Sequence, residues 1–305
     1  MNEPREQRIG VAYSLAAYLA WGILPVYFKA VQSVPTLEVL AHRILWSVVF
    51  LAALTAARGR WAGFATLLRS GRTQLTLMVT TCLIATNWGL FIWAVATGHL
   101  VEASLGYFIG PLVTVALGFV FLRERLRPLQ AISVGLAAIA IVYLTVQYGH
   151  PPLVSMVLAF SFAFYGLLRK QVKASAIQGL TVETLMLSPV ALGWMIWQRR
   201  QGGLVFLDTT WTMNGLLLSA GMLTALPLIW FTEGARRLRL ATMGFLQYLA
   251  PSGQLLLAVL AFGEPFTRDH AVSFGLIWIA LALYSWDTLS SLRTGRAPAT
   301  ATQEA

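Results

Sequence analysis

Ten long apolar runs limit what this chain can fold into. A helix rises about 1.5 Å per residue, so about 20 apolar residues are needed to cross the hydrocarbon layer of a membrane. Runs of this kind are predicted at residues 9–30, 36–57, 74–97, 100–122, 128–147, 151–171, 179–198, 212–235, 238–262 and 269–289. Charged residues make up 11% of the chain, whereas soluble domains carry about 25%. We therefore expect an all-α polytopic membrane protein with ten transmembrane helices.

Basic residues outside these runs collect on one side of the predicted membrane. With the N-terminus in the cytoplasm, seventeen of the 22 Lys and Arg residues lie on the cytoplasmic side and four on the other, while Arg43 lies inside a run. Cytoplasmic loops of membrane proteins carry such an excess. We therefore predict a multi-pass protein of the bacterial cytoplasmic (inner) membrane with both termini in the cytoplasm. The net charge of +10 does not indicate nucleic acid as a partner, because the basic residues form short clusters between apolar runs.

One stretch of the chain occurs twice. Residues 100–143 align without a gap with residues 240–283, and ten of the 44 positions are identical, including one proline and one glutamate. Five predicted spans per half is an odd number, so the second half enters the membrane from the opposite face. Such inverted repeats place a binding site between the halves near the membrane midplane. The predicted units are a first half at 1–148, an inverted second half at 149–290 and a disordered cytoplasmic tail at 291–305.

Two parts of the sequence carry a family resemblance. The turns FLRERLRPLQAISVGLAAIAIVYL and AFGEPFTRDHAVSFGLIWIALALYS resemble the paired signature of EamA-domain proteins in the drug/metabolite transporter (DMT) superfamily. The segment AWGILPVYFKAV followed by LEVLAHRILWSVVF resembles more closely the RarD branch, whose family name refers to chloramphenicol sensitivity. The resemblance covers about residues 8–290. It implies two inverted five-helix halves, a central cavity lined by the first four helices of each half, and small-molecule transport.

The second predicted helix carries ionisable groups, which are costly inside a membrane and mark candidate functional sites. Glu38, His42 and Trp46 are spaced four residues apart and share one helix face, with Arg43 adjacent. Glu102, at the start of the fourth helix, lies at a similar depth. We expect Arg43 to pair with Glu102 or Glu38. The group is interpreted either as a handle for an anion or a proton, or as a structural ion pair that locks a gate.

Polar and aromatic side chains near the middle of other runs complete the candidate site. Asn87 is expected to face another helix or water, because an unpaired amide in lipid is costly. Pro111 and Pro251 each free a carbonyl and kink a helix, and such kinks are tolerated beside a cavity. We therefore expect these two helices to form the cavity wall, although packing is the alternative for any single ring. The predicted solute-binding residues are Trp21, Glu38, His42, Arg43, Asn87, Trp88, Glu102, Tyr107, Tyr165, Trp230, Gln247 and Tyr248.

Four more carboxylates lie near the ends of predicted helices. Glu124 and Glu264 occupy equivalent positions of the repeat. At a helix C-terminus a carboxylate opposes the helix dipole, so we expect each to pair with a nearby arginine or to cap the next helix. Glu183 and Glu233 are expected to meet the basic clusters at their helix ends, such as Arg169.

The leading functional hypothesis is a secondary-type transporter for a small organic metabolite or drug-like solute, with aromatic and amphipathic solutes as candidates. The sequence has no Walker motif, no clustered carboxylates and no His/Cys pattern with metal-ligand spacing, so neither metal nor cofactor is expected. The alternatives are a membrane-embedded enzyme that modifies lipids or prenyl groups, and a channel-like pore. The expected partners are the solute and the lipid bilayer. Coupling to protons or a counter-solute and assembly into a homodimer stay open.

Overall fold

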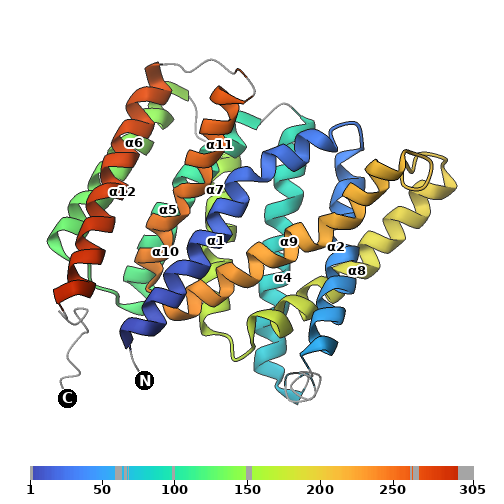
Figure 1. The fold of residues 1–305 in the computed structure, drawn as a ribbon, viewed down its shortest axis with the longest axis horizontal. Helices are drawn as coiled ribbons and strands as arrows, with labels where there is room; N and C mark the ends of the chain where they lie inside the picture. The colour runs from blue at the N-terminus through green and yellow to red at the C-terminus, as the bar shows by residue number, and fades with distance from the viewer. Residues whose placement is uncertain are drawn as a thin grey trace.

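The computed structural model is built from helices, and it describes residues 3–58, 64, 67, 69–97, 100–148, 153–261, 263 and 268–294. The helices are α1 (Glu3–Ala30), α2 (Thr36–Ala57), α4 (Gly71–Ala96), α5 (Leu100–Leu122), α6 (Pro128–Tyr148), α7 (Leu153–Gln171), α8 (Ala176–Arg200), α9 (Trp211–Arg237), α10 (Leu240–Gln247), α11 (Leu249–Leu260) and α12 (Arg268–Thr294) (Figure 1). Ten spans in these ranges are long and apolar enough to cross a membrane, and α10 with α11 forms one of them. The described ranges contain no strand. The predicted all-α fold with ten membrane-spanning helices is confirmed.

The ninth span departs from the single helix that we expected over 238–262. It is interrupted at Tyr248, where α10 ends and α11 begins. Pro251 has no N–H group, so the carbonyl of Gln247, four residues earlier, loses its helical partner and the helix bends. The equivalent Pro111 lies inside α5, which continues without interruption.

Several helices extend beyond their apolar runs into charged or polar residues. Helix α1 begins at Glu3, and α9 ends at Arg237. Helix α12 reaches Thr294, so its last four residues lie in the segment 291–305 that we predicted as a disordered tail. Hydropathy marks only the part of a helix inside the hydrocarbon layer of about 30 Å, whereas the headgroup regions add about 10–15 Å. The remaining tail, 295–305, lies outside the described residues.

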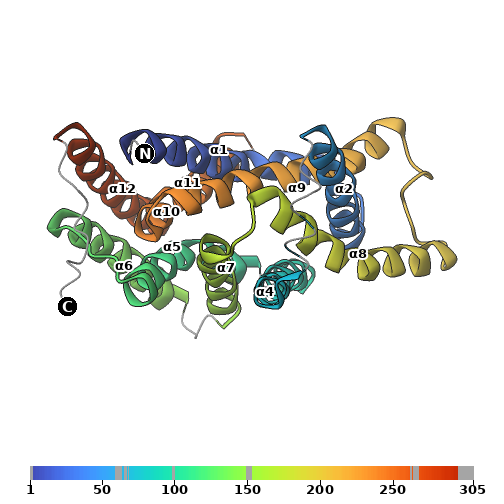
Figure 2. The ribbon, with the colours of Figure 1, turned by 90° about the horizontal axis from the view of Figure 1, so that it is seen from below.

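The helices form two layers, which Figure 2 shows in a view from below. One layer contains α1, α2, α9, α10, α11 and α12. The other contains α4, α5, α6, α7 and α8. Each layer therefore combines helices from both halves of the sequence, and the halves are interleaved rather than lying side by side.

The packing of the helices repeats when the two halves are exchanged. Helix α1 packs against α9 and α11, and its counterpart α7 packs against α4 and α5. Three further contacts pair a helix with its own counterpart across the layers: α2 with α8, α5 with α10, and α6 with α12. An approximate twofold axis relates inverted repeats in this way. The pattern supports the predicted halves, while their boundary at residues 148 and 149 stays a prediction.

One side-chain contact shows how this bundle tolerates proline. Pro25 lies inside α1 and leaves the carbonyl of Trp21 without its usual helical donor. Gln254 of α11 donates its Nε2–H to that carbonyl at 3.1 Å. A polar residue of the second half thereby satisfies a backbone group of the first half, as kinked membrane helices require.

Candidate functional site

Arg43 extends from α2 to helices of both layers. Its Nε–H donates a hydrogen bond of 2.9 Å to Thr224 Oγ1 on α9. The guanidinium carbon lies 5.0 Å from the ring centroid of Trp88 on α4 and 5.7 Å from that of Phe28 on α1. Tyr107 of α5 lies within electrostatic range of the same guanidinium. These five residues, which we name the Arg43 cluster, come from five helices.

The Arg43 cluster remains accessible although its helices pack against one another. Tyr107 is 38% exposed, and Phe28, Arg43 and Trp88 are half-buried. A guanidinium carries five N–H donors, and Thr224 takes the one on Nε. Aromatic faces attract such a cation by about 0.5–2 kcal/mol each, depending on its desolvation. The rings therefore hold the guanidinium in place without using up its hydrogen-bond donors.

The expected pair between Arg43 and Glu38 is not formed. The ion pairs among the described side chains do not include Arg43. The Glu38 carboxylate instead accepts hydrogen bonds from the backbone N–H groups of Val205, at 3.0 Å, and Phe206, at 2.8 Å. Residues five apart on a helix lie about 140° apart around its axis, so the two side chains face different neighbours. The side chain of Glu102 lies outside the described residues, and its pairing with Arg43 stays a prediction.

Glu38, His42 and Trp46 share one helix face, as predicted. The Trp46 Nε1–H donates to His42 Nδ1 at 2.8 Å, and His42 Nε2 lies 4.0 Å from Glu38 Oε1. The His42 ring meets Phe206 edge-on, with 4.5 Å between the ring centroids. This face therefore holds the connection between α8 and α9. It does not join the Arg43 cluster.

Tyr165 belongs to a buried polar network around Glu183 of α8. The Glu183 carboxylate accepts hydrogen bonds from Thr80 on α4 at 2.6 Å and from Tyr165 on α7 at 3.2 Å. The Arg169 Nη1 lies 3.7 Å from the same carboxylate. All four side chains are buried, and the network joins α4, α7 and α8. The prediction that Glu183 meets Arg169 is confirmed.

Trp21 and Trp230 pack against an aromatic core between α1, α7 and α9. The Trp21 ring centroid lies 5.6 Å from that of Phe162 and 5.8 Å from that of Phe231. Trp230 packs against the same core cluster as a partly buried ring, and Tyr165 is fully buried in it. These rings pack together inside the bundle in this arrangement, and their contact with a solute stays a prediction.

Asn87 joins the third and sixth spans, as expected for an amide that avoids lipid. Its Nδ2 group donates to the backbone carbonyl of Leu158 at 2.9 Å and to Ser161 Oγ at 3.0 Å, both on α7. The next residue along α4, Trp88, contacts Arg43 instead. Helix α4 therefore presents one polar contact to α7 and the neighbouring aromatic ring to the Arg43 cluster.

Gln247 and Tyr248 lie where α10 crosses α5. Gln247 accepts a hydrogen bond of 3.4 Å from Thr114 of α5. Tyr248 is 1% exposed and packs in a core cluster with Phe245 and Tyr284, on the side of α6 and α12. The two predicted proline-containing spans thus pack against each other. Gln247 and Tyr248 of the second span do not contact the Arg43 cluster in the structure, whereas Tyr107 of α5 belongs to it.

Glu124 caps a helix of the other half of the chain. Its Oε1 accepts the backbone N–H of Leu240 at 2.8 Å, and its Oε2 accepts that of Ala241 at 2.9 Å. A carboxylate is favourable there, because the N-terminus of α10 presents unpaired N–H groups and positive dipole charge. We expected Glu124 to pair with a nearby arginine or to cap the next helix, α6. It caps α10 instead, and its Oε2 lies 4.0 Å from Arg239 Nε. The equivalent Glu264 lies outside the described residues.

Two members of the Arg43 cluster, Thr224 and Phe28, are not among the residues predicted from the sequence. Thr224 carries no signal in a single sequence, because a threonine in an apolar helix commonly bonds to the carbonyl four residues earlier. Phe28 lies near the end of the first run, where its ring reads as a membrane-interface residue. The only available signal was Arg43 itself, since a buried cation must find partners on neighbouring helices.

Comparison with known proteins places the chain among transporters by sequence. Residues 8–146 match the EamA-like transporter family. An "Uncharacterized transporter" of Vibrio cholerae is 44% identical, over 96% of this chain and 97% of that protein. "Protein RarD" of Escherichia coli K12 is 42% identical over 95% and 98%, and "Chloramphenicol-sensitive protein RarD" of Pseudomonas aeruginosa is 33% identical over 93% and 96%.

A solved structure shares the fold at low sequence identity. It superposes with a TM-score of 0.68 and 19% identity, covering 91% of this chain and 97% of the other, and its title reads "Crystal structure of protein". The arrangement of ten spans in two layers is therefore not particular to this sequence.

Proposed function

The chain belongs to the RarD-like proteins of the EamA-like transporter family, and from this premise we propose that it moves a small organic solute across the bacterial inner membrane by alternating access. Full-length relatives named as transporters support the transport activity. The inverted packing of the halves supports alternating access, because a two-fold related bundle can open to either side around a fixed central site.

The observation that carries the proposal is the position of Arg43. Its guanidinium lies between the layers, over Trp88 and Phe28, and pairs with no described carboxylate. A cation inside a membrane bundle is energetically costly, so a cation without a carboxylate partner marks a candidate functional site. We propose that the Arg43 cluster binds the anionic group of the solute, while Trp88 and Tyr107 contact its apolar or aromatic part.

The two ends of the bundle support an outward-facing state. Near the end that carries the N-terminus, Glu183 and Arg169 form their buried network, Glu124 caps α10, and Arg237 pairs with Glu233. Three contacts at that end tie the two halves together: Thr80 of α4 donates to Glu183, Glu124 of the first half caps α10, and Arg237 also pairs with Glu6 of α1. The Arg43 cluster lies toward the other end, where Arg43, Trp88 and Tyr107 are accessible. If basic loops face the cytoplasm, the solute would enter the Arg43 cluster from outside in this state.

A ligand screen tests the proposal. Purified protein would be heated with amino acids, amines, nucleosides and phenicols, and binding would raise the unfolding temperature. Replacing Arg43 by Gln removes a charge-assisted hydrogen bond worth about 1.5–3 kcal/mol. The dissociation constant of an anionic ligand should therefore rise about 10–100-fold. Arg200→Gln, an exposed cation at the end of α8, is the matched control and should leave binding unchanged.

Transport itself is measured in proteoliposomes. Uptake should saturate with solute and show counterflow, which a channel would not. If Arg43→Gln binds and transports like the wild type, Arg43 is not the solute handle. If the variant unfolds early without ligand and the exchange Arg43→Glu with Glu102→Arg restores both stability and transport, Arg43 serves a structural ion pair instead.

A further inference from the structure

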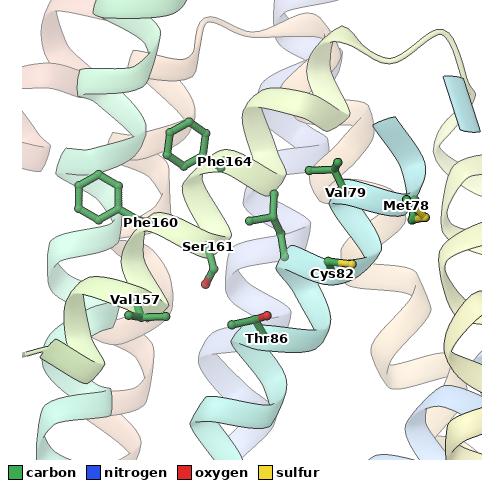
Figure 3. A pocket seen from close by; sticks show the side chains of 9 residues that line it. Met78, Val79, Cys82, Thr86, Val157, Phe160, Ser161 and Phe164 are labelled. Atoms are coloured by element: carbon green, nitrogen blue, oxygen red, sulfur yellow. The ribbon is translucent and has the colours of Figure 1, made fainter. Parts of the chain in front are cut away.

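An open groove runs along the outer surface between α4 and α7, away from the Arg43 cluster (Figure 3). Its volume is about 430 Å³. The walls are apolar, and they are formed mainly by Met78, Val79 and Cys82 on α4 and by Val157, Phe160 and Phe164 on α7. Of these side chains Phe164 is half-buried and the others are exposed.

The floor of the groove is closed. Leu83 packs against the central core, and Ser161 is buried and hydrogen-bonded to Asn87. The groove therefore does not lead into the bundle, and a molecule that occupies it approaches from the bilayer. From Met78 to Thr86 the groove is about 12 Å long, similar to the depth of one membrane leaflet of about 15 Å. These dimensions fit one acyl chain.

One end of the groove is strongly basic. Arg72 is exposed in the first turn of α4, and Lys173 is exposed just after α7. The two helix ends lie together, because Leu77 and Val172 belong to one core cluster. Arg72 lies six residues, about 9 Å, from Met78 at the mouth of the groove. A lipid whose chain fills the groove would therefore have its headgroup near both cations.

The stretches of sequence that contain Arg72 and Lys173 carry no acidic residue that could neutralise these two cations. Neither residues 39–101, which contain α4, nor residues 125–182, which contain α7, include an Asp or Glu. The acid that follows, Glu183, is buried in its own network with Arg169. We propose that the α4–α7 groove binds one anionic phospholipid, with an acyl chain in the groove and the headgroup phosphate between Arg72 and Lys173. The site is independent of which solute the protein transports.

Native mass spectrometry of the purified protein tests this site. The protein would be incubated with equal amounts of dioleoyl phosphatidylglycerol and dioleoyl phosphatidylcholine, and the retained lipid counted. Each cation near a headgroup contributes about 1 kcal/mol, so two should give a roughly tenfold or greater preference for the anionic lipid. The double variant Arg72→Gln with Lys173→Gln should lose that preference. Arg5→Gln with Arg8→Gln changes the charge equally on α1, in the other layer, and should keep it.

A bulky side chain placed in the groove tests whether an acyl chain binds there. Cys82→Trp should reduce retention of both lipids, whereas Val190→Trp on the exposed face of α8 should not. Equal retention of the two lipids by the wild type would overturn the proposal, as would an unchanged preference in the Arg72 and Lys173 variant.

A second measurement needs no destabilising variant. Cys82 is the only cysteine in the chain, so a small bimane fluorophore can be attached there alone. Phosphatidylglycerol with brominated chains should quench this fluorophore at a mole fraction several times lower than brominated phosphatidylcholine does. Identical quenching curves would show that the groove meets only bulk lipid, which would refute the site.

Discussion

At the scale of single residues, the charged side chains inside the bundle fall into two kinds, buried pairs and accessible cations. Arg169 and Glu183 are both almost inaccessible, at 0% and 1% exposure, and they lie 3.7 Å apart. Arg43, by contrast, is accessible and is held by a hydroxyl and by aromatic rings. A buried pair is costly to break, because removing one partner leaves an uncompensated charge. An accessible cation is available for a ligand.

We therefore predict strong non-additivity at the buried pair. Arg169→Leu should lower the free energy of unfolding by about 3–5 kcal/mol, because Glu183 loses its counter-charge. Combining it with Glu183→Gln should recover most of that loss, since the charge left behind is removed. Unfolding in mixed detergent micelles gives the free energies. Arg199→Leu breaks an exposed pair with Asp208 and should cost at most about 1 kcal/mol.

A second prediction concerns a strained turn that the repeat shares. Arg123, at the end of α5, has φ +52°, and the equivalent Gly263 has φ +71°. A left-handed conformation costs a residue with a side chain about 1–2 kcal/mol, whereas glycine adopts it freely. Arg123→Gly should therefore raise the unfolding temperature.

Gly263→Ala provides the opposite test of the same turn. No atom lies within 4 Å of the added methyl group, so only backbone strain should lower the unfolding temperature. An unchanged unfolding temperature in both variants would show that the turn relaxes at no cost.

At the scale of elements, the apolar runs predicted where helices lie but not which helices meet. The predicted ranges of α2 and α5 agree with the structure at both ends, because the apolar runs there stop at Pro35, Arg58 and Arg123. The partner of Glu124 lies 116 residues away, and no local pattern specifies a contact of that kind. The sequence also did not predict which helices Arg43 contacts. Arg43 and His42 are adjacent and both polar, so their pattern does not show which neighbours each side chain faces.

Among the described glycines, Gly221 of α9 would bring an added Cβ nearest to the backbone of another helix, α2. A side chain at Gly221 would overlap the backbone of Trp46 and Ser47, and the Ser47 hydroxyl already donates to the Gly221 carbonyl at 3.1 Å. Membrane helices use small residues to pack this closely. The crossing fixes the position of α2, and therefore that of Arg43.

We predict that Gly221→Ala separates these helices. The unfolding temperature should fall clearly, because backbone rather than a flexible side chain blocks the added methyl group. Gly215→Ala, six residues earlier on α9, adds a methyl group with no atom within 4 Å. It should be neutral or slightly stabilising, because alanine favours the helix by about 1 kcal/mol over glycine. Equal effects of the two substitutions would show that the crossing is not tight.

At the scale of the whole molecule, the distribution of basic residues indicates which end of the bundle faces the cytoplasm. Helix α8 runs from Ala176, beside the basic segment after α7, to Arg200, beside the connection to α9. Its 25 residues span about 37 Å, enough to separate the two membrane faces. Among the described residues, most Lys and Arg side chains lie in or beside the helix ends on the same side of the bundle as Gln171. A positive-inside orientation would place this end in the cytoplasm.

This orientation can be measured with two matched glutamines. Gln171 ends α7 and Gln201 follows α8, and both side chains are exposed. With Cys82 replaced by Ser, we predict that Gln201→Cys reacts with a membrane-impermeant maleimide in intact bacterial cells. Gln171→Cys should react only after the inner membrane is permeabilised, because it lies on the cytoplasmic side. The reverse labelling pattern would invert the topology and turn the accessible side of the Arg43 cluster toward the cytoplasm, which would make the state described here inward-facing.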